Sequence, residues 1–149
     1  MPSAVMQVIE ELSRSGRGIK VAIVDDDLPF LGNLEADLSP WGFELTLLSQ
    51  PQQLWSVLNQ VNPDVLVLDV DMPGLSGREL CQVLRSDLCW QRLPILFLSA
   101  HPDLLNEPEA LAIGADDFLC KPIAAADLAS RILTRLERAR SQGVSRADV

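Results

Sequence analysis

The chain has 149 residues, of which 48% are hydrophobic and 22% are charged, a balance typical of one globular domain with its own core. Its formal net charge of −9 argues against direct binding to nucleic acid, which requires a basic surface. The apolar runs are too short to cross a membrane and no secretion signal is recognisable, so we expect a cytoplasmic protein.

Taken in chain order, residues 1–18 form an extension or linker, in which Val5, Ile9 and Leu12 would share one face of a short helix. Short apolar runs then alternate with stretches of helical period, which predicts βα repetition and a mostly parallel sheet. The predicted strands cover residues 19–24, 43–48, 65–68, 95–98 and 117–120. The predicted helices cover residues 29–38, 52–59, 76–85, 109–113 and 125–140, and a tail follows at 141–149.

Two of these predicted helices need comment. Pro108 precedes the fourth helix, and we expect it to delay or kink that helix because proline lacks a backbone N–H. The last helix has an apolar stripe formed by Leu128, Ile132 and Leu136, with arginines mostly off the stripe. It is therefore an amphipathic helix that docks on the domain, or one that dimerises or carries a signal.

Polar side chains follow four of the predicted strands, at the sheet edge where open α/β folds bind ligands. They are Asp25, Asp26 and Asp27 after the first strand, Asp69 and Asp71 after the third, Ser99 after the fourth and Lys121 after the fifth. If these strands are neighbours, the polar groups converge on one crevice. The second acidic pair, Asp116–Asp117, is assigned only a loop role.

Three carboxylates gathered in one crevice repel one another unless a cation lies among them, and oxygen ligands favour Mg²⁺. Asp25, Asp26 and Asp69 bring three negative charges, while Mg²⁺ and Lys121 bring three positive charges. Such a near-neutral site could offset the charge that develops during phosphoryl transfer. Asp69 would be the nucleophile, and Ser99 and Lys121 would hold the phosphoryl oxygens.

The order and spacing of these motifs resemble the receiver domain of two-component response regulators, the family that includes chemotaxis regulators. The resemblance covers residues 19–140 and rests on four segments, IVDDD, PDVLVLDVDMPGLSG, PILFLSA and GADDFLCKP. It implies an α/β fold with a doubly wound, five-stranded parallel sheet in the order 2-1-3-4-5. Helices on both faces would make this a flavodoxin-like three-layer sandwich.

By position, the resemblance also implies the metal ligands. Asp25 and Asp26 match the family's acidic pair, with Asp26 favoured as the direct ligand. Asp69 matches the phosphoacceptor, which is also a ligand, and Asp71 would offer its backbone carbonyl. The cofactor implied is Mg²⁺.

Four further positions match the family's switch machinery. Ser99 corresponds to the switch hydroxyl, Phe118 to the switch aromatic residue and Lys121 to the lysine that contacts the phosphoryl group, while Pro122 corresponds to a proline that follows that lysine in a cis peptide. Phosphorylation of Asp69 would draw Ser99 toward it and leave space into which Phe118 turns. The surface that changes would be formed by the predicted helix at 109–113, strand at 117–120 and helix at 125–140.

The resemblance implies a signalling protein rather than an enzyme, apart from Mg²⁺-dependent phosphorylation and autodephosphorylation of its own Asp69. The phosphoryl donor would be a sensor histidine kinase or a histidine phosphotransfer protein, and the partner an output domain or protein. No direct nucleic acid or membrane partner is expected. A homodimer, the identity of the kinase and membership of a longer chain are left open.

Asp71 and His101 occupy positions that vary in the family, two residues after Asp69 and Ser99 respectively. We hypothesise that they tune the lifetime of the phosphoryl group, because we predict that they lie beside the path of an attacking water. For His101, a solvated loop position is the alternative.

Two other functions compete with this interpretation. The Asp-x-Asp of LDVDMPG also occurs in phosphatases of the haloacid dehalogenase type, but here the acidic pair precedes the nucleophile and there is little room for a cap. A receiver-like module that signals without phosphorylation is the other alternative, although such modules usually lack an acidic residue or the lysine. The sequence contains neither GxGxxG nor GxxxxGK[ST], the two glycine-rich motifs that bind nucleotides.

Overall fold

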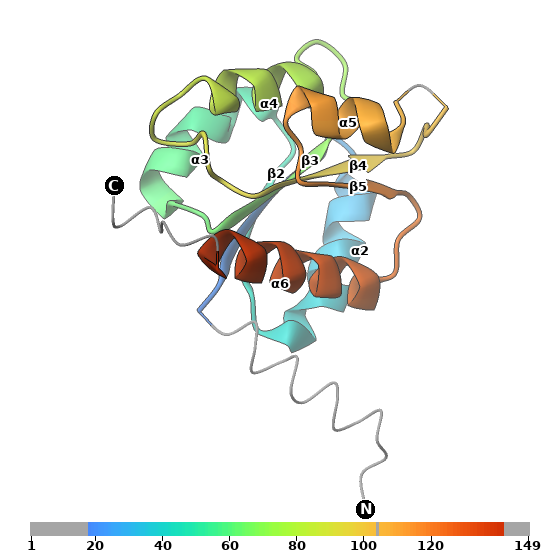
Figure 1. The fold of residues 1–149 in the computed structure, drawn as a ribbon. Helices are drawn as coiled ribbons and strands as arrows, with labels where there is room; N and C mark the ends of the chain where they lie inside the picture. Colours follow the sequence, from blue (N-terminus) through green and yellow to red (C-terminus); the bar gives the residue numbers. More distant parts are fainter. Residues whose placement is uncertain (1–17, 104, 142–149) are drawn as a thin grey trace, which may run out of the picture.

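Residues 18–103 and 105–141 are described by a computed structural model, shown in Figure 1. Five parallel strands form one sheet in the order β2-β1-β3-β4-β5, which confirms the predicted topology. The strands are β1 (Lys20–Val24), β2 (Glu44–Leu48), β3 (Val65–Asp69), β4 (Ile95–Ser99) and β5 (Asp117–Cys120).

Helices cover both faces of this sheet, as expected of a three-layer sandwich (Figure 1). They are α2 (Leu28–Leu38), α3 (Leu54–Val61), α4 (Gly77–Arg85), α5 (Glu107–Ile113) and α6 (Ala125–Ser141), with short 3₁₀ helices at Ser39–Trp41 and Pro51–Gln53. In the described part of the chain, no helix has both the length and the apolar character needed to cross a bilayer. The predicted N-terminal helix around Val5, Ile9 and Leu12, and the tail after Ser141, lie outside the described residues.

The alternation of side chains along each strand creates two hydrophobic cores, one on each face of the sheet. On β3, Leu66 and Leu68 pack in the core beneath α3, α4 and α5, while Val65 and Val67 pack in the core beneath α2 and α6. All four are fully buried, and burying one such side chain contributes about 1.5–3 kcal/mol. The central strands are therefore rigid supports for whatever follows them in the sequence.

The fourth predicted helix begins earlier than expected, at Glu107 instead of residue 109. Asn106 caps it by accepting a hydrogen bond from the backbone N–H of Glu109 at 2.9 Å. Pro108 lies in the first turn, where a backbone N–H has no partner within the helix, so the proline costs nothing there. The expected delay or kink at Pro108 was wrong for this reason.

Asp116 lies in the loop before β5, as assigned, whereas Asp117 lies in β5, within the predicted strand, and both carboxylates have specific partners. Asp116 accepts hydrogen bonds from the backbone N–H of Ile95 at 2.8 Å and from the guanidinium of Arg85 at 2.9 Å. Arg85 also donates to the carbonyls of Gly114 and Leu93, at 2.8 and 2.6 Å. This arginine therefore ties the end of α4 to the residues that begin β4 and β5.

Asp117 lies in β5 with only 2% of its surface exposed, and it faces α6. Arg131 donates to both of its carboxylate oxygens, at 2.8 and 2.9 Å, and Arg135 donates to one of them at 3.1 Å. Burial by itself raises the pKa of Asp117, but hydrogen bonds from Arg131, from the backbone N–H of Phe118 and from Arg135 outweigh burial and lower it. The ion pairs therefore hold α6 against β5.

We predict that Asp117→Asn lowers the free energy of unfolding at neutral pH by about 1–3 kcal/mol, a range reduced because Arg131 is half exposed. Because the folded-state pKa of Asp117 is depressed, its stabilisation is present above about pH 4 and is lost as the pH falls through the folded-state value. Denaturant titrations between pH 3 and pH 7 should therefore show that the difference between wild type and variant shrinks in acid. Asp37→Asn, at an exposed position of α2, is the control and should show no such pH dependence.

Candidate functional site

The carboxyl ends of four adjacent strands bring the predicted site residues to one edge of the sheet. Asp25 follows β1, Asp69 ends β3, Ser99 ends β4 and Lys121 follows β5. Hydrogen bonds between backbones continue past the strand ends, since the N–H of Asp25 donates to Leu48 at 2.9 Å and the N–H of Lys121 donates to Ser99 at 2.8 Å. The parallel order therefore fixes the backbone positions of these residues.

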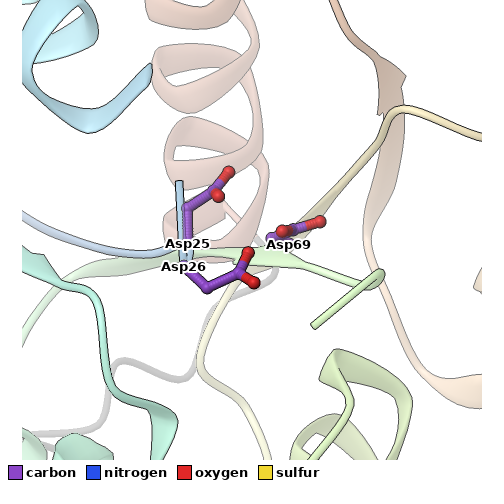
Figure 2. Close-up of side chains that lie close together, drawn as sticks. All are labelled: Asp25, Asp26 and Asp69. Carbon is purple, nitrogen blue, oxygen red and sulfur yellow. The ribbon is translucent and has the colours of Figure 1, made fainter. Parts of the chain in front are cut away.

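Three carboxylates lie together at the centre of this edge, as Figure 2 shows. Asp25, Asp26 and Asp69 each offer one oxygen, and these oxygens lie within 4.8 Å of one another. Asp25 and Asp69 are buried, with 0% and 3% of their surface exposed, whereas Asp26 is exposed. The cluster therefore has two carboxylates in the protein interior and one that faces solvent.

The loop after β1 is held in shape by its own aspartates. The backbone N–H of Asp27 donates to Oδ1 of Asp25 at 2.9 Å. Oδ1 of Asp27 in turn accepts from the backbone N–H of Phe30 at 3.1 Å and so caps α2. The acidic run thus fixes both the Asp25 carboxylate and the first turn of the helix.

Lys121 brings the positive charge of the site. Its Nζ lies 2.5 Å from Oδ2 of Asp25 and 3.7 Å from Oδ2 of Asp69, and its side chain is only 15% exposed. Although burial lowers the pKa of Lys121, its hydrogen bond to Asp25 and the charges of Asp25 and Asp69 more than offset this and raise it. The ammonium is therefore charged at neutral pH and joins the ends of β1, β3 and β5.

The negative charge around the Asp69 carboxyl exceeds the positive charge that Lys121 supplies. Burial, together with the nearby charge of Asp25, raises the pKa of Asp69 to about 6, although the backbone N–H of Asp71 and the charge of Lys121 act in the opposite direction. Three carboxylates against one ammonium leave two negative charges uncompensated. A divalent cation would balance them.

The donor set fits Mg²⁺. All three donors are carboxylate oxygens, the hard ligands that this ion prefers, and the exposed Asp26 leaves a side open where water ligands are retained. Ligands of one Mg²⁺ lie about 2.1 Å from the ion, so opposite ligands are about 4.2 Å apart. Neighbouring ligands are closer together than opposite ones, so three oxygens that lie within 4.8 Å of one another would move inward to hold one ion.

Ser99 and Asp71 form a second group beside the carboxylate cluster. The hydroxyl of Ser99 donates to Oδ2 of Asp71 at 3.0 Å, and the backbone N–H of Ala100 donates to the same oxygen at 3.0 Å. The backbone N–H of Asp71 donates to Oδ1 of Asp69 at 3.0 Å. The fully buried Ser99 hydroxyl is therefore linked to Asp69 through Asp71. The predicted role of the Asp71 carbonyl as a metal ligand stays a prediction.

The other predicted residues lie around this centre. Phe118 is half-buried on β5 and packs against the core beneath α3, α4 and α5, beside its cross-strand neighbour Phe97. His101 is exposed and contributes its backbone N–H, which donates to the hydroxyl of Ser99 at 3.0 Å. The peptide bond between Lys121 and Pro122 is cis, as predicted.

Two residues of the site were not singled out from the sequence. A Cβ atom at Gly77 would lie 2.6 Å from the carbonyl oxygen of Asp69 and 3.1 Å from the Cα of Val70, so only glycine fits where α4 begins against Asp69. The second glycine of PGLSG was the available signal for this contact. The ring of Phe30 lies 4.3 Å from Nζ of Lys121, and nothing in the local sequence indicates that contact.

Comparison with known proteins agrees with this fold and site. The family model of the response regulator receiver domain matches residues 21–133. Protein RcaC of Microchaete diplosiphon is 56% identical over 122 residues, which cover 82% of this chain, and the phosphate regulon transcriptional regulatory protein PhoB of Rhizobium meliloti is 35% identical over 126 residues, which cover 85%. The chain belongs to the response regulator receiver domain family of two-component systems.

Solved structures and relative lengths complete the comparison. The receiver domain of the Francisella response regulator 1452 matches with a TM-score of 0.72 and 30% identity, covering 81% of this chain and 98% of that one. A receiver domain protein from Clostridium thermocellum matches with a TM-score of 0.75 and 26% identity, covering 83% and 98%. The chain spans only 19% of the length of RcaC and 56% of the length of PhoB.

We predict that Mg²⁺ raises the Tm of the protein, because the ion would bind the folded carboxylate cluster and not the unfolded chain. At a metal concentration 100 times Kd the gain is about 2.7 kcal/mol, which corresponds to a shift of several degrees. Differential scanning fluorimetry with Mg²⁺ and with EDTA measures the shift. Asp26→Ala should abolish it and Asp37→Ala should not; a wild type that does not respond to saturating metal would contradict the site.

Proposed function

We propose that this receiver domain accepts a phosphoryl group on Asp69 with Mg²⁺ bound by Asp25, Asp26 and Asp69, and that the modification changes its conformation. One observation carries the proposal. A buried Asp69 carboxylate lies 3.7 Å from a charged Lys121 ammonium and shares a cluster of oxygens with two further aspartates. These are the nucleophile, the cation and the metal ligands that phosphoryl transfer to a carboxylate requires.

The transfer proceeds as a substitution at phosphorus. A carboxylate oxygen of Asp69 forms a bond to phosphorus while the P–N bond of a phosphohistidine donor breaks, and the electron pair of that bond leaves with the imidazole. Lys121 holds one phosphoryl oxygen by charge. A bound Mg²⁺ supplies the positive charge that offsets the charge on the phosphoryl oxygens. Autodephosphorylation is attack of water on the same phosphorus, and we propose no enzymatic activity beyond these reactions of Asp69 itself.

The switch requires Ser99 to change its hydrogen-bond acceptor. Its hydroxyl is bonded to Asp71, so contact with a phosphoryl oxygen on Asp69 breaks that bond and moves the end of β4. Since the N–H of Lys121 donates to the carbonyl of Ser99, the movement reaches β5, where Phe118 can turn. The surface that changes comprises α5, β5 and α6. The size of the population shift depends on how much more favourable the contacts of the phosphoryl group are in one arrangement than in the other.

The proposed partners follow from family membership and charge. The donor is a sensor histidine kinase or a histidine phosphotransfer protein, and the face formed by α5, β5 and α6 contacts an output domain, a partner protein or a second copy of the chain. PhoB is a transcriptional regulatory protein and MtrA of Mycobacterium tuberculosis is a DNA-binding response regulator. For this chain, with its net charge of −9, we propose no direct contact with nucleic acid and a cytoplasmic location.

We predict that acetyl phosphate with Mg²⁺ adds one phosphoryl group to the wild type, measured by intact-mass spectrometry. Asp69→Asn should show no adduct, because the amide is not a nucleophile, and EDTA should suppress the reaction in wild type. Lys121→Ala should slow the reaction at least tenfold, since it removes the only cationic side chain in contact with the Asp25 and Asp69 carboxylates among the described residues. An unmodified wild type that still binds partners would favour the phosphorylation-independent module instead.

The lifetime of the acyl phosphate is the second measurement. We predict that Asp71→Asn and His101→Ala change it by about threefold or more, because the Asp71 carboxylate accepts the hydrogen bond of Ser99 beside Asp69, and the exposed His101 side chain follows Ser99 at the path that we propose for an attacking water. Loss of radiolabelled phosphate after removal of the donor gives the rate. Gln82→Ala, at an exposed position of α4, is the control, and three equal lifetimes would end the hypothesis.

A further inference from the structure

Lys121 has an aromatic neighbour in addition to its two carboxylate partners. Nζ lies 4.3 Å from the centroid of the Phe30 ring, on α2. This distance is well inside the range of about 6 Å over which a ring face attracts a cation. Phe30 is half-buried and packs against the core beneath α2 and α6. The ring is therefore supported by the interior of the protein.

A lysine needs such support to keep its ammonium in one place. Its side chain is a flexible stem of four carbons, and the ammonium at its end acts as a point charge that does not require one fixed orientation. Asp25 and Asp69 attract Nζ, at 2.5 and 3.7 Å. The Phe30 ring adds a third contact to Nζ, in keeping with a charged side chain that is only 15% exposed.

The position of the ring is set by the acidic loop itself. The backbone N–H of Phe30 donates to the Asp27 side chain, and the backbone N–H of Asp27 donates to the Asp25 side chain. Phe30 in turn contacts Lys121, and Nζ of Lys121 donates a hydrogen bond to Asp25, so the four contacts form a closed ring. The loop that presents the metal ligands therefore also places the ring against the lysine.

We propose that Phe30 is a positioning residue for phosphoryl transfer, and that its ring face holds the Lys121 ammonium between Asp25 and Asp69 by cation–π attraction. This inference rests on the proposed function. It implies that the electron density of the ring matters, and not only its volume. A saturated side chain of similar size would fill the space without attracting the charge.

The test replaces Phe30 with phenylalanines that carry one, two and three ring fluorines, which weaken the attraction stepwise with little change in shape. The rate constant for phosphorylation by acetyl phosphate at saturating Mg²⁺ should fall with each fluorine, to a total of about three- to tenfold. Phe30→Leu should show a similar loss and Phe30→Tyr should retain the rate. The Tm shift caused by Mg²⁺ should stay at the wild-type value, because the metal ligands are unchanged.

The same fluorinated series at Phe43 is the matched control, since that ring is buried in the same core. It should leave the rate unchanged. A spectroscopic measurement does not depend on activity: the ε-methylene protons of Lys121 should be shifted upfield by the ring current in wild type and return to ordinary values in Phe30→Leu.

Three results would overturn the role of Phe30 while the proposed function stands: a flat series at position 30 with a normal wild-type rate, equal slopes at positions 30 and 43, or the absence of a ring-current shift. A wild type that is not phosphorylated at all would overturn the proposed function and this inference together.

Discussion

The buried ion pair between Asp25 and Lys121 is the interaction on which the site depends. Asp25 has no exposed surface, and an unpaired carboxylate at such a depth would destabilise the fold by several kcal/mol. Its partner comes from a position 96 residues away and from the other side of β3 and β4. The pair therefore forms only when the parallel sheet is complete. It neutralises one of the three aspartates and leaves the charge of the other two for a cation, so that one contact contributes both to the fold and to the chemistry.

Much of this arrangement could be predicted from the sequence because a parallel sheet imposes it. The apolar runs define five strands, and polar residues that directly follow parallel strands must meet at one edge, so the meeting of Asp25, Asp26, Asp69 and Lys121 required no knowledge of side-chain contacts. The partners of individual charges were a different matter. Asp117 was given only a loop role because its two arginines lie 14 and 18 residues further along the chain, and only the docking of α6 brings them into contact.

The same limit explains the other differences. Pro108 was expected to disturb its helix, because a preference assigned to the residue alone ignores the Asn106 cap, with which the helix begins at Glu107, two residues earlier than predicted. Phe30 has the apolar character of an ordinary core residue, and its second contact, with Lys121, depends on how α2 leaves β1. The meeting of the strand-end residues follows from the parallel sheet and was thus confirmed. The arginine partners of Asp117, the contact of Phe30 with Lys121 and the effect of the Asn106 cap were missed, because each depends on neighbours that one residue's own preference does not reveal.

The two sides of the site differ in how easily their contacts can be exchanged. Toward α2, Asp25, Asp27 and Phe30 form a set of contacts that hold the loop after β1 and the lysine. Toward α5, the Ser99 hydroxyl is bonded to Asp71 beside Asp69, so a new acceptor on Asp69 competes directly for it. We therefore propose that a rearrangement beginning at Asp69 moves the Ser99 side more than the α2 side. Since β5 is joined to Ser99 by a backbone hydrogen bond and to α6 by Asp117, the proposed change would reach the face formed by α5, β5 and α6.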